Sequence, residues 1–464
     1  MRTLLVSTYE LGHQPLHVAS PAAALLAAGH EVRCLDLSLE PWGSELVDWA
    51  EAVAFSVPMH TAMRLAAVAA RQVRRRRPKL PICVYGLYAP VARDAEIAAV
   101  ADRAIAGEYE PALVDWFGEL EERGRDGTPD APEERTAGPP APTLHLGRTE
   151  FGIPARHLLP PLERYAHLVL DGEERPVGYV EATHGCRHRC RHCPLPVVYD
   201  GALRVVARNT VLADVEALVA MGARHITFGD ADFLNGPGHA LRIVRAMHER
   251  FPDLTFDCTV KVEHVLDHAH LWPELAASGC LFVVTAIETL NDEILARLDK
   301  GHNAADAADA VALLREHRIE PRPTFLPFTP WTRIDDVLEL LEFVVEYELV
   351  GNVDPVQLSL RLLLPQGSLL LERPDPILAG ALGPYDQERL TYTWSSPDPM
   401  VDLLQARLAE LVERSAADGD RPGLTFERVR AAVLEVSGRP DAVELAMPSG
   451  SVEGRPRMTE PWFC

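Results

Sequence analysis

The chain has 464 residues, 47% of them hydrophobic and 24% charged, which is typical of a globular protein with two or three domains. A net charge of −23 argues against a nucleic-acid partner, because phosphates are bound by Lys and Arg, and no run approaches the roughly 20 apolar residues that span a membrane. Eight cysteines and an N-terminus without signal-peptide features predict a cytoplasmic protein with free thiols.

The first part of the chain, residues 1–122, alternates short β-like runs with helix-like runs. The expected strands are Thr3–Thr8, Glu31–Leu37, Ala52–Val57 and Pro81–Tyr85, and the expected helices are Pro21–Ala28 and Ala62–Arg77. This alternation predicts a doubly wound, Rossmann-like α/β domain with a mostly parallel sheet. Residues 123–150 are rich in Gly, Pro and charge without apolar periodicity, which predicts a linker.

Three cysteines, Cys186, Cys190 and Cys193, follow the apolar run Val177–Val180 with C-x3-C-x2-C spacing. A short loop of this kind can direct three thiolates at one iron–sulfur cluster, and three ligands leave one iron of a 4Fe-4S cluster open. The alternative is a structural Cys3His zinc site, because three histidines alternate with the cysteines. These are His184, His188 and His192. The spacing favours the cluster, since zinc ligands usually come in two separated pairs.

Downstream of the cysteines, strand-like and helix-like runs alternate again, which predicts a partial βα (TIM-like) barrel over 151–370 with its chemistry on the loops after the strands. The expected elements are helix Asn209–Met221 and strands His225–Phe228, Thr255–Val262, Leu281–Ile287, Pro321–Phe328 and Val356–Leu364. Residues 371–464 are expected to form a C-terminal helical cap over the open mouth of the barrel, where it could meet substrate. Pro374–Trp394 is expected to be irregular, and Met400–Ala417 and Thr425–Val436 to be helices.

The cysteine spacing resembles that of the radical S-adenosylmethionine (SAM) superfamily. The resemblance implies that Cys186, Cys190 and Cys193 hold a 4Fe-4S cluster whose open iron chelates SAM. It also implies that SAM is positioned by residues on the loops that follow the strands. These residues are His192 before the last cysteine, the glycine–acid segment with Gly229, Asp230 and Asp232, and Glu288 at the end of the fourth strand, which would bind the ribose of SAM. The Lys300–Asn303 segment resembles a loop of related proteins.

The first domain resembles the cobalamin-binding-like domain that precedes many radical SAM cores. Ser56, Gly86 and Gly107–Glu110 carry this resemblance, but the Asp-x-His-x-x-Gly motif that supplies a lower cobalt ligand is absent. We expect His13, His17 and His60 to be solvated loop histidines. Cobalamin therefore stays open as a further cofactor, and a domain that only packs on the core is the alternative.

The C-terminus, Met458–Cys464, resembles a radical SAM subgroup whose tails continue through Cys-Cys-Ala-Glu-Pro or Cys-selenocysteine-Ala-Glu-Pro. The hypothesis that follows is that a selenocysteine codon comes after Cys464 in the natural gene. A thiol–selenol pair there would make a redox tail.

These observations predict a radical SAM enzyme that reductively cleaves SAM to modify a small-molecule or peptide substrate, with cobalamin-dependent methyl transfer as an option. Its electron donor would be a flavodoxin or ferredoxin. The sequence does not indicate which substrate is used. Two alternatives stay open: a radical SAM enzyme that modifies tRNA, and a non-enzymatic zinc or redox-sensing module.

Overall fold

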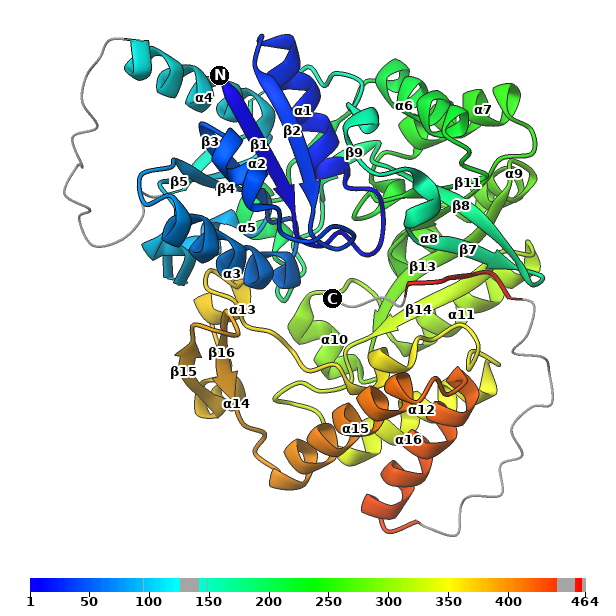
Figure 1. Cartoon of the computed structure of the whole chain (residues 1–464). Helices are drawn as coiled ribbons and strands as arrows, with labels where there is room; N and C mark the ends of the chain where they lie inside the picture. The colour runs from blue at the N-terminus through cyan, green and yellow to red at the C-terminus, as the bar shows by residue number, and fades with distance from the viewer. Residues whose placement is uncertain (95, 126–141, 148, 440–454, 461–464) are drawn as a thin grey trace.

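The computed structural model describes residues 1–94, 96–125, 142–147, 149–439 and 455–460, which build two sheets with helices around them (Figure 1). The first sheet has six parallel strands in the order β2-β1-β3-β4-β5-β6. Its strands are β1 Arg2–Ser7, β2 Glu31–Asp36, β3 Ala52–Ser56, β4 Ile82–Tyr85, β5 Arg103–Gly107 and β6 Thr143–His145. Its helices are α1 Leu16–Ala27, α2 Ser44–Trp49, α3 His60–Arg76 and α4 Tyr109–Arg125. The predicted doubly wound arrangement is confirmed.

Two details of the first sheet differ from the sequence-based expectation. Helix α1 begins at Leu16 rather than Pro21, so a proline lies inside it. Pro21 has no N–H for the carbonyl of His17 four residues earlier, and the Tyr85 hydroxyl donates to that carbonyl instead, at 2.9 Å. Part of the predicted linker is also structured, because β6 pairs with β5.

The second sheet has seven strands in the order β14-β13-β12-β11-β8-β7-β17, and the five consecutive strands from β14 to β8 are parallel. Its strands are β7 His167–Leu170, β8 Glu173–Val180, β11 His225–Phe228, β12 Thr255–Thr259, β13 Cys280–Glu288, β14 Glu320–Phe325 and β17 Arg457–Met458. Its helices are α6 Arg208–Ala220, α7 Pro237–Arg250, α8 Val262–Asp267, α9 Trp272–Ala277, α10 Asp292–Leu298, α11 Ala304–Glu316 and α12 Ile334–Glu346. Helices follow each of the five parallel strands, as the predicted partial barrel requires.

The prediction of a sixth barrel strand at Val356–Leu364 is wrong. The segment forms a 3-10 helix, η7 (Pro355–Ser359), followed by a single bridge between Phe328 and Arg361. The backbone N–H of Phe325 in β14 is instead bound by the side-chain Oε1 of Gln357, at 3.2 Å. A side chain therefore replaces one backbone acceptor that a further strand would have supplied.

The C-terminal part contains more regular structure than expected. Its elements are α13 Leu369–Glu372, α14 Pro376–Ala381, β15 Leu382–Asp386, β16 Thr391–Trp394, α15 Pro399–Ala417 and α16 Pro422–Val436. The supposedly irregular Pro374–Trp394 holds a helix, capped by Asp375 at 2.9 Å from the Leu378 N–H, and an antiparallel hairpin. The two predicted long helices are present and pack along α12 and η7, on the flank of the second sheet. Cys464 and its proposed continuation lie outside the described residues.

The two sheets are joined by buried polar contacts and by the β15–β16 hairpin. Arg156, 2% exposed, pairs with Asp214 at 2.8 and 3.0 Å and also donates to the carbonyls of Gln14 and Tyr179. The hairpin turn reaches α3, where the Nε2 of His60 lies 2.6 Å from the carbonyl oxygen of Arg389. Within the described residues, no helix is long and apolar enough to cross a bilayer.

Candidate active site

The three cysteines lie on the loop after β8, with a short ladder between β9 (Thr183–Gly185) and β10 (Leu203–Val205) at its base. We call residues 181–194 the cluster loop. Cys186 and Cys190 are buried and Cys193 is half-buried. The amide of Asn235, in the 3-10 turn η5 (Phe233–Asn235), donates to the Cys186 sulfur at 3.3 Å and accepts from the Arg187 N–H at 3.2 Å. The loop after β11 therefore holds the first cysteine in place.

The spacing of the sulfurs suits a cluster better than a single zinc ion. Four-coordinate zinc with Zn–S bonds of about 2.3 Å brings its sulfurs to about 3.8 Å from one another. In the described part of the chain, one set of three Cys, His, Asp or Glu ligand atoms lies within 4.8 Å of one another, and it contains none of these cysteines. Burial raises the pKa of Cys193 to about 12, and a bound metal centre would favour the thiolate again. The donor set therefore fits an iron–sulfur cluster.

Glu288 lies at the last position of β13, where the pairing with β14 shifts register after Ala286. Its φ of +67° is in the left-handed region, which a non-glycine residue adopts only when its surroundings require it. The irregularity directs its Oε1 to the Nζ of Lys300 at 3.0 Å and to the Nε2 of His192 at 3.2 Å. Burial opposes ionisation of Glu288, but Lys300 and His192 outweigh it and hold its pKa well below the usual range.

The sequence does not predict Lys300 as a site residue, although the Lys300–Asn303 segment resembles a loop of related proteins. Its side chain is 3% exposed, and the negative charge of Glu288 outweighs burial and raises its pKa. The thiols of Cys190 and Cys193 act in the same direction, which places the ammonium beside the cluster loop. Glu288, Lys300 and His192 thus form one charged group next to the cysteines at the carboxyl end of the second sheet.

The glycine–acid segment after β11 is closely packed. A Cβ on Gly229 would come within 1.9 Å of the Tyr179 hydroxyl, so only glycine fits there. Asp230 is 1% exposed and accepts from the Ala182 N–H at 2.9 Å and the Thr183 hydroxyl at 2.5 Å. Burial raises the pKa of Asp230 to about 7.

The carboxylate of Asp232 faces two histidines. Its Oδ1 accepts from the Leu234 N–H at 3.1 Å, while its Oδ2 lies near His188 and His264. Both acids therefore contact protein groups, and their assignment to the SAM ammonium stays a prediction.

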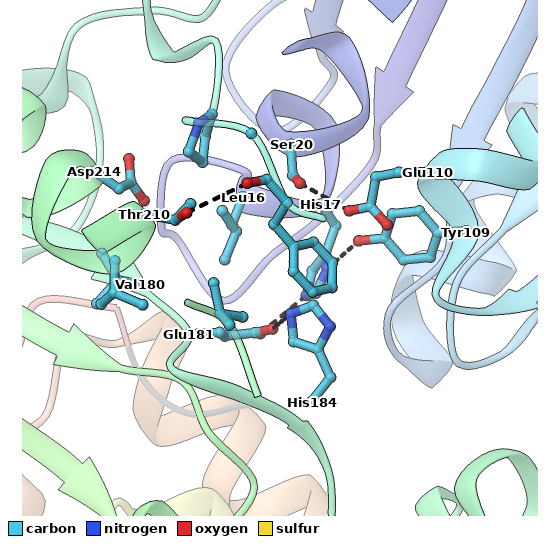
Figure 2. Close-up of a pocket in the computed structure, with 15 residues that line it drawn as sticks. Leu16, His17, Ser20, Tyr109, Glu110, Val180, Glu181, His184, Thr210 and Asp214 are labelled. Atoms are coloured by element: carbon cyan, nitrogen blue, oxygen red, sulfur yellow. Dashed lines mark hydrogen bonds and ion pairs between the residues drawn. The ribbon is translucent and has the colours of Figure 1, made fainter. Parts of the chain in front are cut away.

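The side of the cluster loop that faces the first sheet carries a second charged network (Figure 2). The carboxylate of Glu181 lies 3.3 Å from the Nε2 of His17 and 3.3 Å from the Nε2 of His184, and it accepts from the Tyr179 hydroxyl at 2.9 Å. The Nδ1 of His184 lies 3.0 Å from the Oε2 of Glu108. Burial opposes these charges, but the pairing lowers the pKa of Glu181 to about 2 and raises that of His184 to about 10.

The expectation of solvated histidines in the first domain is wrong. His13 and His60 are buried and His17 is half-buried, because the loops that carry them face the second sheet or the β15–β16 hairpin. The cavity beside His17 and Glu181 has a volume of about 30 Å3, room for about two water molecules. This space is too small for a corrin ring.

Residues 180–344 match the Radical SAM superfamily. The chain thus carries a radical SAM domain. The predicted superfamily and enzyme class are confirmed by this match, which also supports the predicted 4Fe-4S cluster and SAM. One curated relative, a tRNA-2-methylthio-N(6)-dimethylallyladenosine synthase of Chlorobium limicola, is 26% identical over 174 residues, which are 36% of this chain and 38% of the relative. The chain thus matches well under two thirds of that relative's length.

Two similar solved structures support the fold of most of the chain. TsrM, a radical SAM methyltransferase of Kitasatospora setae solved with cobalamin and a [4Fe-4S] cluster, has a TM-score of 0.57 at 19% identity and covers 75% of this chain and 70% of its own. OxsB, a cobalamin-dependent SAM radical enzyme solved with aqua-cobalamin and SAM, has a TM-score of 0.68 at 13% identity and covers 89% of this chain and 67% of its own. At these identities the likeness shows the fold, and it agrees with the predicted α/β architecture.

Proposed function

We propose that the protein binds a 4Fe-4S cluster through Cys186, Cys190 and Cys193 and reductively cleaves SAM to modify a small-molecule or peptide substrate. When bound, the cluster supplies the electron that breaks the C5′–S bond of SAM. The observation that carries the proposal is the group of Glu288, Lys300 and His192 beside the cysteines. A carboxylate and an ammonium held together in a buried place can bind both a ribose hydroxyl and a carboxylate of an amino-acid ligand.

The residues of the site have separate roles in this proposal. Glu288 and His192 bind the nucleoside part of SAM, and Lys300 keeps Glu288 ionised. Gly229 lets the backbone approach Tyr179 and the ligand closely. Asp230 is a positioning residue, because it binds Ala182 and Thr183 at the start of the cluster loop.

The electron donor is proposed to be an acidic flavodoxin or ferredoxin that docks on the outer face of the cluster loop. Arg187 and Arg189 are exposed there. Next to them is a surface hollow lined by Arg189, Arg191, Asp299, Leu369, Glu372 and Arg373. Three of these six residues are arginines in a chain of net charge −23, so this face offers local positive charge to an anionic protein.

We further propose the division into a cobalamin-binding-like domain at 1–122, a linker at 123–150, a radical SAM core at 151–370 and a C-terminal part at 371–464. Two structures of similar fold contain cobalamin. The cavity beside His17 and Glu181 is too small for a corrin ring, so we propose only the cluster and SAM as cofactors. Reconstitution with and without hydroxocobalamin, with methyl transfer as the measured product, decides whether this second cofactor takes part.

The test is anaerobic reconstitution with iron and sulfide, followed by SAM and dithionite, with 5′-deoxyadenosine as the measured product. We expect about four irons per chain and nucleoside formation that is lost in Cys186→Ala. Cys258→Ala is the matched control, since this buried cysteine lies in β12, outside the cluster loop, and should leave both unchanged. A protein that takes up no cluster, or nucleoside that persists in Cys186→Ala, contradicts the proposal.

Modification of tRNA is the second candidate, because the curated relative carries that name. The net charge of −23 disfavours it. Binding of bulk tRNA that survives 150 mM salt, together with a methylthiolated nucleoside after turnover, would establish it. We expect neither.

A further inference from the structure

Three side chains from different elements converge beside the cluster loop, apart from the cysteines. They are His188 between the first two cysteines, Asp232 after β11 and His264 on α8. The Oδ2 of Asp232 lies 2.7 Å from the Nδ1 of His264 and 3.5 Å from the Nε2 of His188, and the three atoms are all within 4.8 Å of one another. The two imidazole rings have centroids 4.6 Å apart.

The three facing atoms are buried, and none has a hydrogen-bond partner. Asp232 is 0% exposed, and its other oxygen already caps η5. Its Oδ2, the Nε2 of His188 and the Nδ1 of His264 face one another as ion-pair contacts, but none of the three makes an aligned hydrogen bond. The 2.7 Å approach to His264 lacks the alignment of a hydrogen bond, and 3.5 Å to His188 is beyond the usual range. A buried carboxylate oxygen without a donor is costly, so a missing partner is indicated.

A metal ion satisfies all three atoms at once. Ligands about 2.0 to 2.2 Å from one tetrahedral zinc ion lie about 3.3 to 3.6 Å from each other. The 3.5 Å between Asp232 and His188 fits this range, and the 2.7 Å between Asp232 and His264 would have to lengthen by less than about 1 Å. Two imidazoles and one carboxylate are a donor set for divalent transition ions such as zinc or iron(II). The exposed fractions of the His188 and His264 side chains, 18% and 15%, leave a path of entry.

We propose that His188, Asp232 and His264 bind one divalent transition-metal ion of the zinc class, separate from the iron–sulfur cluster. The ion joins the cluster loop to the loop after β11 and to α8. The Oε2 of Glu263 lies 3.6 Å from the Nδ1 of His188, so a second carboxylate stands behind one ligand, as is common for metal-bound histidines. This assignment gives Asp232 a metal ion as its partner in place of the ammonium of SAM.

The proposal is tested on the reconstituted holoenzyme. Zinc is added in small excess, unbound metal is removed by desalting, and iron and zinc are counted by mass spectrometry. We expect one zinc per chain in addition to the cluster iron. X-ray absorption at the zinc edge should show nitrogen and oxygen neighbours at about 2.0 to 2.2 Å and no sulfur at about 2.3 Å.

Two variants remove ligands and one serves as a control. His264→Gln and Asp232→Asn should each weaken zinc binding at least 100-fold in a competition titration with a chelator. His268→Gln should bind zinc like the wild type, because its ring lies 5.3 Å from that of His264 without belonging to the group of three. Two ligand variants are needed because Asp232 is buried and Asp232→Asn could fail to fold for that reason alone. His264→Gln then still tests the site.

Three results would overturn the proposal: no zinc beyond the cluster iron, zinc surrounded by sulfur, or unchanged affinity in His264→Gln. The metal count and the ligand shell are read without any turnover. Failure of this site would leave 5′-deoxyadenosine formation intact, whereas failure of the proposed function would remove that product and leave the zinc count unchanged.

Discussion

Histidines contact carboxylates on both sides of the cluster loop, but the two sides differ in how many of their buried polar atoms are hydrogen-bonded. Toward the first sheet, His184 has both ring nitrogens within 3.3 Å of carboxylates, those of Glu108 and Glu181. Toward the second sheet, His188 and His192 also face carboxylates, those of Asp232 and Glu288. On the first side the ring nitrogens of His17 and His184 all contact protein groups, although the Oε1 of Glu108 has no hydrogen-bond partner. On the second side the imidazoles themselves keep buried nitrogens without hydrogen bonds, the Nε2 of His188 and the Nδ1 of His192.

This difference between the two sides indicates that one side supports the cluster loop and the other binds ligands. A side chain whose polar atoms are all bonded to protein fixes a loop, while one with an unused buried atom can still receive a ligand. The first side therefore fixes the cluster loop on the first sheet. The second side is where the cluster, SAM and the proposed ion would meet.

The largest expected effect comes from the second side. Glu288→Gln leaves the ammonium of Lys300 buried without a counter-charge, which costs about 3 to 5 kcal/mol of stability. It also removes a charged acceptor for SAM, so we expect 5′-deoxyadenosine formation to fall about 100-fold. Urea titration and the nucleoside assay measure the two effects.

A double variant separates these two roles of Glu288. In Glu288→Gln/Lys300→Met both charges are gone, so most of the stability should return while SAM cleavage stays low. If cleavage returns with stability, Glu288 acts only as a partner for Lys300, and the functional reading of this side is wrong.

Packing of the segment after β11 gives the next effect. Gly229→Ala places a methyl group against the ring of Tyr179, so we expect a loss of about 1 to 3 kcal/mol and a shift of the loop that precedes Asp230. Gly118→Ala in α4 is the control, because nothing lies within 4 Å of its added methyl. Equal urea midpoints for the two variants would show that the close approach to Tyr179 is not required.

The first side should be visible as a pH dependence of stability. Burial opposes protonation of His17, but Glu181 and Glu10 raise its pKa to about 9 from 6.5. Its contribution is therefore fully present below pH 6.5 and is lost as the pH rises through 9. Glu10, whose pKa burial raises from 4.5 to about 7, acts in the same direction, but its contribution is lost between pH 4.5 and pH 7.

We expect the Tm of the wild type to fall by about 5 °C between pH 7 and pH 9.5, and that of His17→Gln to fall clearly less. Scanning calorimetry at matched ionic strength measures both curves. If Tm falls equally with pH in the wild type and in His17→Gln, protonation of His17 does not stabilise the protein.

Sequence patterns were sufficient to predict the features that depend on short stretches of the chain. Apolar strands followed by helices predicted two largely parallel sheets, and the acid at the end of an apolar run predicted that Glu288 needs a buried partner, because burial of each short run decides its own structure. Local patterns failed where a distant side chain compensates. Pro21 is tolerated inside α1 through the hydroxyl of Tyr85, and Gln357 serves the backbone of β14 in place of a strand.

The partners of the three loop histidines could not be predicted in the same way. His184 and Glu108 are 76 residues apart, and His192 and Glu288 are 96 apart. Which carboxylate each histidine meets depends on strand order and on the register shift in β13, and neither is written in the local sequence. Lys300 and His264 were missed for the same reason, since a lone lysine or histidine carries no local signal.

The smallest expected effect concerns the outer face of the cluster loop, which belongs to neither side. Arg189→Glu should slow SAM cleavage driven by reduced flavodoxin about three- to tenfold at low salt, because steering by charge acts mainly on the rate of association. Cleavage driven by dithionite should not change, and the difference should shrink as salt screens the charges. Arg407→Glu on α15 is the matched control, since Arg407 and Arg189 are both exposed arginines paired with one acid. If both variants slow the flavodoxin reaction equally, only net charge matters. If Arg189→Glu alone does so, the donor docks beside the cysteines, on the one face of the loop that is not bound to a sheet.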